Sequence, residues 1–526
     1  MKNRINAPRV LLIALPLLCT ACSVGPDYVK PTAPVPVNTT YKGMNDWKPA
    51  QPKDDAIRGK WWEIYHDPEL NALEDKVNIS NQNVIQSEAQ FRQAVATVKV
   101  ARAAFFPTVT ANPAYTMSEA SQNLSSRSTS GGGSSSSGGG GGTGGSGRST
   151  QHIGAQDVSL YDLPAEATYM VDVWGSVRRN VEASSATAEA SFANLENARL
   201  SFQATLAQDY FSLRGLDAQD ELLSTTVVSY EKFLQLTTNQ YNSGIVSQVD
   251  VAAAKTQLDT TKAQLINIGV QRAAFEDAIA TLTGKPAPDF SLKKRSLAGT
   301  PPAIPAGVPS TLLERRPDIA EAERQVASAN ASIGVQVAGY YPQLTLSATT
   351  GLEAIRFADL FNGPSFFWSV GPTIAQTLFD AGATHGRVQE AQANYDATVA
   401  NYRQVVLTAF QQVQDDLSGL HILKDEAVVQ DEAVAAAKQS LEINLNEYKA
   451  GTVDYLNVIT AQATALNDEV TAVTIRTNRM TTSVLLIEAL GGGWSTGKLP
   501  GKSGVADVPE AQSEISKGKP QGGTTP

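Results

Sequence analysis

Two stretches of the sequence, 175–241 and 385–448, predict α-helices far longer than those of an ordinary globular domain. At about 1.5 Å per residue, each would be on the order of 100 Å long. Apolar residues recur in steps of three and four, which places them on one side of the helix. In the first stretch these residues are Ala188, Phe192, Leu195, Ala198, Phe202, Leu206, Tyr210 and Leu213. A single continuous stripe is typical of a coiled coil, and an antiparallel coiled-coil rod is the simplest interpretation.

The chain contains two copies of one plan, which a plain rod does not explain. Tyr241-Asn-Ser-Gly244 resembles Tyr448-Lys-Ala-Gly451, and apolar residues upstream match at the same offset. Each copy begins with a predicted helical stretch (68–104 and 317–339). Two segments of alternating polarity follow, separated by a loop, and then a long helix. A turn then leads to a last helix (248–282 and 455–490). The first copy carries an insertion, 125–150, made almost wholly of Ser, Gly and Thr, which predicts a flexible loop.

Four segments alternate between apolar and polar residues with a period of two, near 107–118, 160–173, 342–353 and 365–379. This period indicates β-strands with one apolar face. Such strands suit a membrane barrel, in which Phe366, Phe367 and Trp368 would belong to an aromatic girdle; a soluble sheet packed on a helix is equally compatible. A membrane sheet cannot keep open edges, and single-chain barrels begin at about eight strands. The membrane interpretation therefore requires an oligomer, and three chains with four strands each would give twelve.

The first 22 residues predict a processing signal. Lys2, Arg4 and Arg9 precede an apolar run, 10–18, which is much shorter than the roughly 20 residues of a spanning helix. Small residues precede Cys22, as in a bacterial lipobox, so we expect 1–21 to be cleaved and Cys22 to carry a covalent lipid. Ordinary signal cleavage with an unmodified Cys22 is the alternative. Because Ser23, and not Asp, follows the cysteine, the resemblance to lipoproteins implies an outer-membrane address.

Composition argues against several other classes of protein. The net charge of −10 lacks the basic footprint of a nucleic-acid-binding protein. Two cysteines and four scattered histidines provide no recognisable metal-ligand spacing, and no nucleotide-binding or nucleophile motif is present. We therefore expect no enzyme activity, no metal and no cofactor other than the lipid on Cys22.

Several motifs occur in the order seen in one family. They are Val24-Gly25-Pro26-Asp27-Tyr28; Trp61-Trp62 with Asp67-Pro68; the block 308–319 that contains Arg315-Arg316-Pro317-Asp318; Ile333-Gly334-Val335; Tyr341-Pro342-Gln343-Leu344; and Ala489-Leu490-Gly491-Gly492-Gly493-Trp494. Across residues 22–494 the chain resembles the efflux lipoproteins of the TolC-like outer membrane factor family, NodT branch.

The resemblance implies an α+β membrane protein that forms a homotrimer. The trimer would have a shared 12-stranded β-barrel and a 12-helix α-barrel in the periplasm. It would be a passive exit duct for small molecules such as drugs and toxic compounds. Its partners would be a periplasmic adaptor and an inner-membrane pump of the resistance-nodulation-division class. Two alternatives stay open: an outer-membrane component of type I protein secretion, and a lipid-anchored periplasmic coiled-coil scaffold.

The same resemblance suggests the functional residues. The turns at Tyr241–Gly244 and Tyr448–Gly451 would be the periplasmic tips that meet the adaptor; simple helix turns are the alternative. Asp250, Asp454, Leu456 and Thr460 are the candidates for a pore gate. Relatives often have Asp at the position of Thr460, so the charge at this gate would be weaker or would come from Asp250. Asp250 and Asp454 can equally be acids that stabilise helix N-termini. Arg315, Arg316 and Asp318 are expected to be structural, and Trp61 and Trp62 to pack in the helical part.

The predicted organisation is a signal peptide over 1–21 and a lipid-anchored N-terminal segment with a first helix over 22–67. Two efflux repeats follow, 68–295 and 296–494, and then a disordered tail, 495–526. Most of the mature chain would lie in the periplasm.

Overall fold

The computed structural model describes residues 23–34, 59–119, 157–297, 299–304 and 315–500. Cys22, the insertion 125–150, the start of the block 308–319 and the tail beyond residue 500 lie outside these residues. Contacts divide the chain into two units. Among the described residues, the β unit contains 23–25, 101–119, 157–179 and 334–387, and the helical unit contains 26–34, 59–100, 180–297, 299–304, 315–333 and 388–500. Both predicted repeats therefore contribute to both units.

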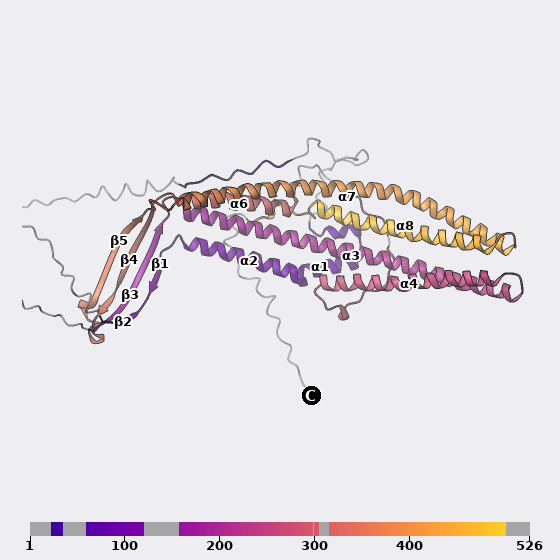
Figure 1. The fold of residues 1–526 in the computed structure, drawn as a ribbon, viewed down its shortest axis with the longest axis horizontal. Coiled ribbons are helices and arrows are strands. Elements are labelled where there is room, and N and C mark those ends of the chain that lie inside the picture. The colour runs from indigo at the N-terminus through magenta and orange to yellow at the C-terminus, as the bar shows by residue number, and fades with distance from the viewer. Residues whose placement is uncertain (1–22, 35–58, 120–156, 298, 305–314, 501–526) are drawn as a thin grey trace, which may run out of the picture. The chain divides into compact units, whose positions relative to one another are not determined.

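The β unit is one antiparallel sheet, drawn as arrows in Figure 1. Its strands are β1 (Thr108–Ala111), β2 (Ala114–Glu119), β3 (Asp157–Val171), β4 (Gln343–Ala354) and β5 (Phe366–Ala375). β1 and β2 both pair with β3, which pairs with β4, which pairs with β5. The four predicted alternating segments thus occupy four adjacent positions in one sheet.

Two strand predictions need correction. The segment 107–118 is not one strand, because the ladder stops between Ala111 and Ala114, where Pro113 has no backbone N–H to donate. The register with β3 nevertheless continues across the break, since Val109 opposes Ala167 and Tyr115 opposes Tyr161. The last strand ends at Ala375, four residues before the predicted end.

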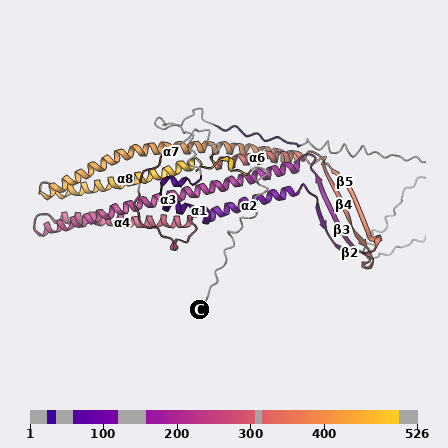
Figure 2. The ribbon, with the colours of Figure 1, turned by 180° about the vertical axis from the view of Figure 1, so that it is seen from behind.

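The helical unit is built around two helix pairs. The long helices α3 (Ser176–Asn242) and α7 (Ala383–Lys449) each have 67 residues, and α4 (Gln248–Leu282) and α8 (Tyr455–Ala489) each have 35. Figures 1 and 2 show α4 returning beside α3 and α8 returning beside α7. Within the described residues, no helix combines the length and the apolar character needed to cross a bilayer.

Shorter helices complete the unit: η2 (Trp61–Tyr65), α1 (Pro68–Ser80), α2 (Gln82–Ala103), α6 (Pro317–Ala338) and η7 (Thr496–Lys498). The single helix predicted over 68–104 is broken at Asn81. Its side-chain oxygen accepts hydrogen bonds from the backbone N–H groups of Asn83 and Val84 and so caps α2, while its side-chain amide donates to the carbonyl of Leu282 at 2.9 Å. The short helix η7 lies at the start of the predicted tail.

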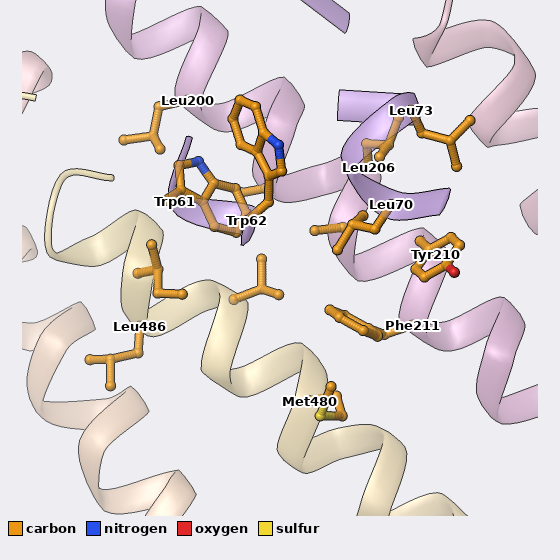
Figure 3. Packing of buried hydrophobic residues seen from close by; sticks show 14 of the residues in the cluster. Trp61, Trp62, Leu70, Leu73, Leu200, Leu206, Tyr210, Phe211, Met480 and Leu486 are labelled. Carbon is orange, nitrogen blue, oxygen red and sulfur yellow. The ribbon is translucent and has the colours of Figure 1, made fainter. Parts of the chain in front are cut away.

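The largest apolar core lies where η2, α1, α3 and α8 meet (Figure 3). Trp61 and Trp62 are buried there, as predicted, together with Leu70 of α1 and Met480 of α8. The predicted stripe of α3 is buried at Ala188, Leu195, Leu206, Tyr210 and Leu213, and half-buried at Phe192, Ala198 and Phe202. The sequence periodicity therefore identified the packed side of the helix.

A buried ionic cluster fastens the middle of α3. Asp217, with a side chain 1% exposed, accepts hydrogen bonds from Arg214 and from Arg272 of α4, each at 2.7 Å. The backbone N–H of Arg295 also donates to it, at 3.0 Å, and Arg214 reaches Glu69 of α1 at 2.6 Å. Sequence reasoning missed this cluster. An Arg and an Asp three residues apart beside the buried Leu213 were the only local signal.

Candidate functional site

The sheet has one apolar face that continues across all its strands. Ladder partners lie on the same face of a sheet, so the register shows which residues share it. Leu163 opposes Leu352, which opposes Phe366; Ala167 opposes Ala348, which opposes Val370. Along the edges, exposed apolar side chains continue the face: Val109, Tyr115, Met117, Trp368 and Ile374.

The opposite face is mostly polar. It presents Thr110, Thr116, Glu166, Thr345 and Ser369, which alternate with the apolar residues. Phe367 is on this face, so the predicted aromatic group 366–368 is split: Phe366 and Trp368 face one way and Phe367 the other. Burial in the protomer does not explain the apolar face, because Val370 is 72% exposed and Trp368 69%.

Both lateral edges of the sheet are open. β1 with β2 forms one edge and β5 the other, and neither edge has a further strand partner among the described residues. An edge strand presents unpaired backbone N–H and C=O groups that can pair with another chain. The sheet can therefore extend in both directions.

The two YxxG turns have nearly identical backbones. Gly244 and Gly451 have φ angles of +75° and +76°, in the left-handed region that favours glycine. Their N–H groups bond back to the carbonyls of Tyr241 and Tyr448, at 2.9 and 3.0 Å. The next N–H groups, of Ile245 and Thr452, bond to the carbonyls of Gln240 and Glu447, one residue before each tyrosine, which completes the same helix-ending motif in both copies.

The two tyrosines differ in their surroundings. Tyr241 is 42% exposed, whereas Tyr448 is 7% exposed and packs against Phe233 and Tyr455. The hydroxyl of Tyr448 donates to the side chain of Gln240 at 2.7 Å, which joins the end of α7 to the end of α3. Burial raises the pKa of Tyr448 and Tyr455, so both remain neutral phenols. Tyr448 is thus a packing residue, and Tyr241 is the tyrosine available at the surface.

The gate candidates lie within the first two turns of α4 and α8 or at the N-cap of α8. Asp250 forms a capping box with Ser247, accepting hydrogen bonds from its backbone N–H at 2.9 Å and its hydroxyl at 2.8 Å. This is the helix-stabilising role that the sequence left open. Asp454 occupies the N-cap position of α8, but its side chain makes no capping bond. Leu456 is 69% exposed, and Thr460, one turn later, is also exposed and donates its hydroxyl to the carbonyl of Leu456.

Arg316 and Asp318, two of the residues expected to be structural, make the contacts of packing residues. Arg316 is buried, binds Asp318 through two nitrogens, and donates to the carbonyl of Ala489 at 2.8 Å. In the N-terminal motif, the Tyr28 hydroxyl donates to Glu323 and the carbonyl of Pro26 accepts from Asn330. Over the described ranges, no three His, Cys, Asp or Glu side chains gather in a way that could hold a metal ion.

Comparison with known proteins identifies the family. The family of outer membrane efflux proteins matches residues 74–285 and 308–492. A probable efflux pump outer membrane protein of Pseudomonas putida, TtgC, is 28% identical over 90% of this chain and 93% of its own length. The pyoverdine export outer membrane protein OpmQ of Pseudomonas aeruginosa is 27% identical over 92% and 97%. The solved outer-membrane channel OprN has a TM-score of 0.78 at 27% identity and covers 90% of this chain and all of its own.

The chain therefore belongs to the outer membrane efflux protein family. It is an outer-membrane protein with a role in efflux, as expected from its sequence motifs.

Proposed function

We propose that three copies of this chain form one exit duct through the outer membrane. The observation that carries the proposal is the sheet: it has a continuous exposed apolar face, a polar face and two open edges. Lipid tolerates a sheet only when every edge is closed. Four strand positions per chain are too few to close alone, and three copies give twelve. The apolar face would contact lipid, and the polar face would line a water-filled pore.

The helical unit would continue this duct in the periplasm as a 12-helix barrel. The turns at Gly244 and Gly451 would form its tips and contact a periplasmic adaptor, with Tyr241 as the exposed aromatic residue there. The constriction would be formed by Leu456, Thr460 and Asp454. These side chains are exposed in the protomer, and none of them makes a hydrogen bond that caps a helix. Asp250 is the weaker candidate, since its carboxylate is held by Ser247.

The partners would be an adaptor and an inner-membrane pump of the resistance-nodulation-division class, which would supply energy and choose the substrates. Curated relatives are named for toluene, antibiotic and pyoverdine export, so we propose small molecules as the cargo. Lipidation of Cys22 would anchor the N-terminus in the membrane. Replacing Cys22 with Ser should abolish incorporation of a labelled fatty acid.

The function is tested by crosslinking the tagged protein in intact cells and identifying its partners by mass spectrometry. Recovery of an adaptor with a resistance-nodulation-division pump, and hypersensitivity of a deletion strain to drugs, is the expected result. Recovery of an ABC exporter would instead indicate type I protein secretion. A protein that remains monomeric in mild detergent would contradict the shared duct and favour the scaffold.

A further inference from the structure

Two adjacent apolar residues project from the β unit shortly after β5. Leu378 is 94% exposed and Phe379 is 89% exposed, more than any other large apolar residue in the described part of the chain. Single exposed apolar residues are common on protein surfaces and need no explanation. Two neighbours that are almost fully exposed indicate instead a contact with something outside the protomer.

The backbone on both sides of this pair is held in place. Before the pair, the side-chain amide of Gln376 donates to the carbonyl of Tyr340 at 3.3 Å. After it, the side chain of Asp380 accepts a hydrogen bond from the backbone N–H of Gly382 at 3.0 Å. Ala381 has a φ of +54°, which a residue other than glycine adopts only where the surrounding structure imposes it. The exposed pair is therefore carried on a turn with a defined backbone.

A second exposed pair lies at the opposite edge of the same sheet. Phe105 and Phe106 come shortly before β1, and Phe106 is 69% exposed. The strands alternate in direction from β1 through β3 and β4 to β5, so the start of β1 and the end of β5 lie at the same end of the sheet (Figure 1). If β5 of one copy pairs with β1 of another, this antiparallel order continues and the two exposed pairs come together.

The chain already contains one joint of this kind, between its two repeats. β3 ends beside the start of β4, and Trp174, which follows β3, stacks on Tyr341, which precedes β4, with ring centroids 4.7 Å apart. The indole N–H of Trp174 donates to the carbonyl of Pro342 at 2.8 Å. The motif Phe-Phe-Pro at 105–107 is the counterpart of Tyr-Tyr-Pro at 340–342. The start of β1 therefore offers the kind of surface that the start of β4 offers to Trp174.

We propose that the pair 378–379 of one copy packs against the pair 105–106 of the neighbouring copy and forms an apolar clasp between protomers. The partner that covers this surface is a second copy of the same chain. The inference rests on the shared duct proposed above, and it adds a side-chain contact outside the strand ladder. Each clasp joins two different surfaces, a type of contact that closes into a ring when the rotation fits. Contact with lipid alone would not explain why both pairs lie at the open edges and at the same end.

Cysteine crosslinking in isolated outer membranes tests the clasp. Phe106→Cys and Phe379→Cys are combined in one full-length chain and treated with a short bismaleimide, and the products are separated after denaturation. We expect covalent dimers and trimers. The matched control combines Phe379→Cys with Met117→Cys, because Met117 is exposed on β2 at the same edge but far along the ladder from Phe106. The control pair should give no crosslinked product.

Assembly is measured separately, from the migration of unheated samples of the parent protein and the cysteine variants. Trimers that form while the 106–379 pair gives no more product than the control would overturn the clasp and leave the shared duct standing. A parent protein that forms no trimer would contradict the duct, and the clasp with it.

Substitutions test whether the contact stabilises the assembly. Phe106→Ala and Phe379→Ala should each lower the temperature at which the trimer dissociates by a few degrees. Phe361→Ala is the matched control, because Phe361 is also 69% exposed but lies in the loop between β4 and β5, and it should leave that temperature unchanged. Residues in contact are coupled, so the double variant should lose clearly less than the sum of the two single losses. Single losses no larger than that of Phe361→Ala would overturn the assignment.

Discussion

The orientation of the sheet can be tested with two neighbouring residues of β5. Val370 is on the apolar face, where it opposes Ala348 midway along the β4–β5 ladder, and Ser369 is on the polar face opposite Thr349. If the apolar face contacts lipid, the side chain at 370 lies near the middle of the bilayer. Val370→Arg and Ser369→Arg place the same charge at the same depth on opposite faces.

The two substitutions should differ strongly in cost. An arginine on the lipid face near the midplane destabilises a membrane barrel by about 2–4 kcal/mol, while a substitution that faces the lumen costs little. Because a trimer carries the change three times, the difference becomes about 6–12 kcal/mol per assembled duct. A loss of that size is comparable with the whole stability of many folded proteins.

The assay is migration of unheated and heated outer-membrane samples on a gel, with antibody detection. Ser369→Arg should form detergent-stable trimers at the level of the parent protein, and Val370→Arg should give little trimer and less protein in the outer membrane. The opposite pattern would mean that the faces are reversed. Equal trimer levels in both variants would refute the membrane-facing interpretation of the apolar face.

Three further predictions concern the helical unit. Asp217→Asn removes the carboxylate that two buried arginines share and should destabilise the protein by about 3 kcal/mol, the lower end for a broken buried ion pair, because Glu69 and Glu276 still contact the arginines. Asp259→Asn, in an exposed pair with Lys255, should cost under about 1 kcal/mol, and denaturant or thermal unfolding distinguishes the two variants. Burial and the nearby acids Asp415 and Glu488 raise the pKa of Asp416 from its ordinary 3.8 to about 7, so the native state holds an extra proton between those values. Stability from this group is full below about pH 4 and falls as the pH rises to about 7, and Asp416→Asn should flatten that part of the profile of thermal midpoint against pH. Leu456→Ala should widen the proposed constriction and raise single-channel conductance in planar bilayers, and an unchanged conductance would remove Leu456 from the gate.

The sequence predicted the regular elements well, because each had a strong period. The helix 248–282 agrees at both ends with α4, and the faces of the strands follow from simple alternation. The failures occurred where a local signal competed with a periodic one. Asn81 interrupts an apolar pattern that runs through it, and Pro113 interrupts an alternation that continues beyond it. Asn and Pro often end a helix or a strand, but the periodic pattern on both sides of Asn81 and Pro113 predicted that the element continues.

Other features depend on contacts between distant segments. Arg214 and Asp217 look like a surface pair until Arg272, from another helix, joins them in the core. The proposed gate residues are an extreme case, because a constriction formed by three chains would not be specified within one.

Pairing between the open edges of neighbouring protomers is the central claim, and cysteine crosslinking in isolated membranes measures it directly. One cysteine replaces Val370 on β5, and a second is moved along Thr108–Ala111 on β1, since strand pairs bring Cα atoms within disulfide range. Cysteines at Ser347 and Gly371, which oppose each other within one chain, serve as the positive control. We predict covalent dimers and trimers at one register of the moving cysteine. Efficient crosslinking of the control pair, with no intermolecular product at any register, would contradict a barrel shared between chains.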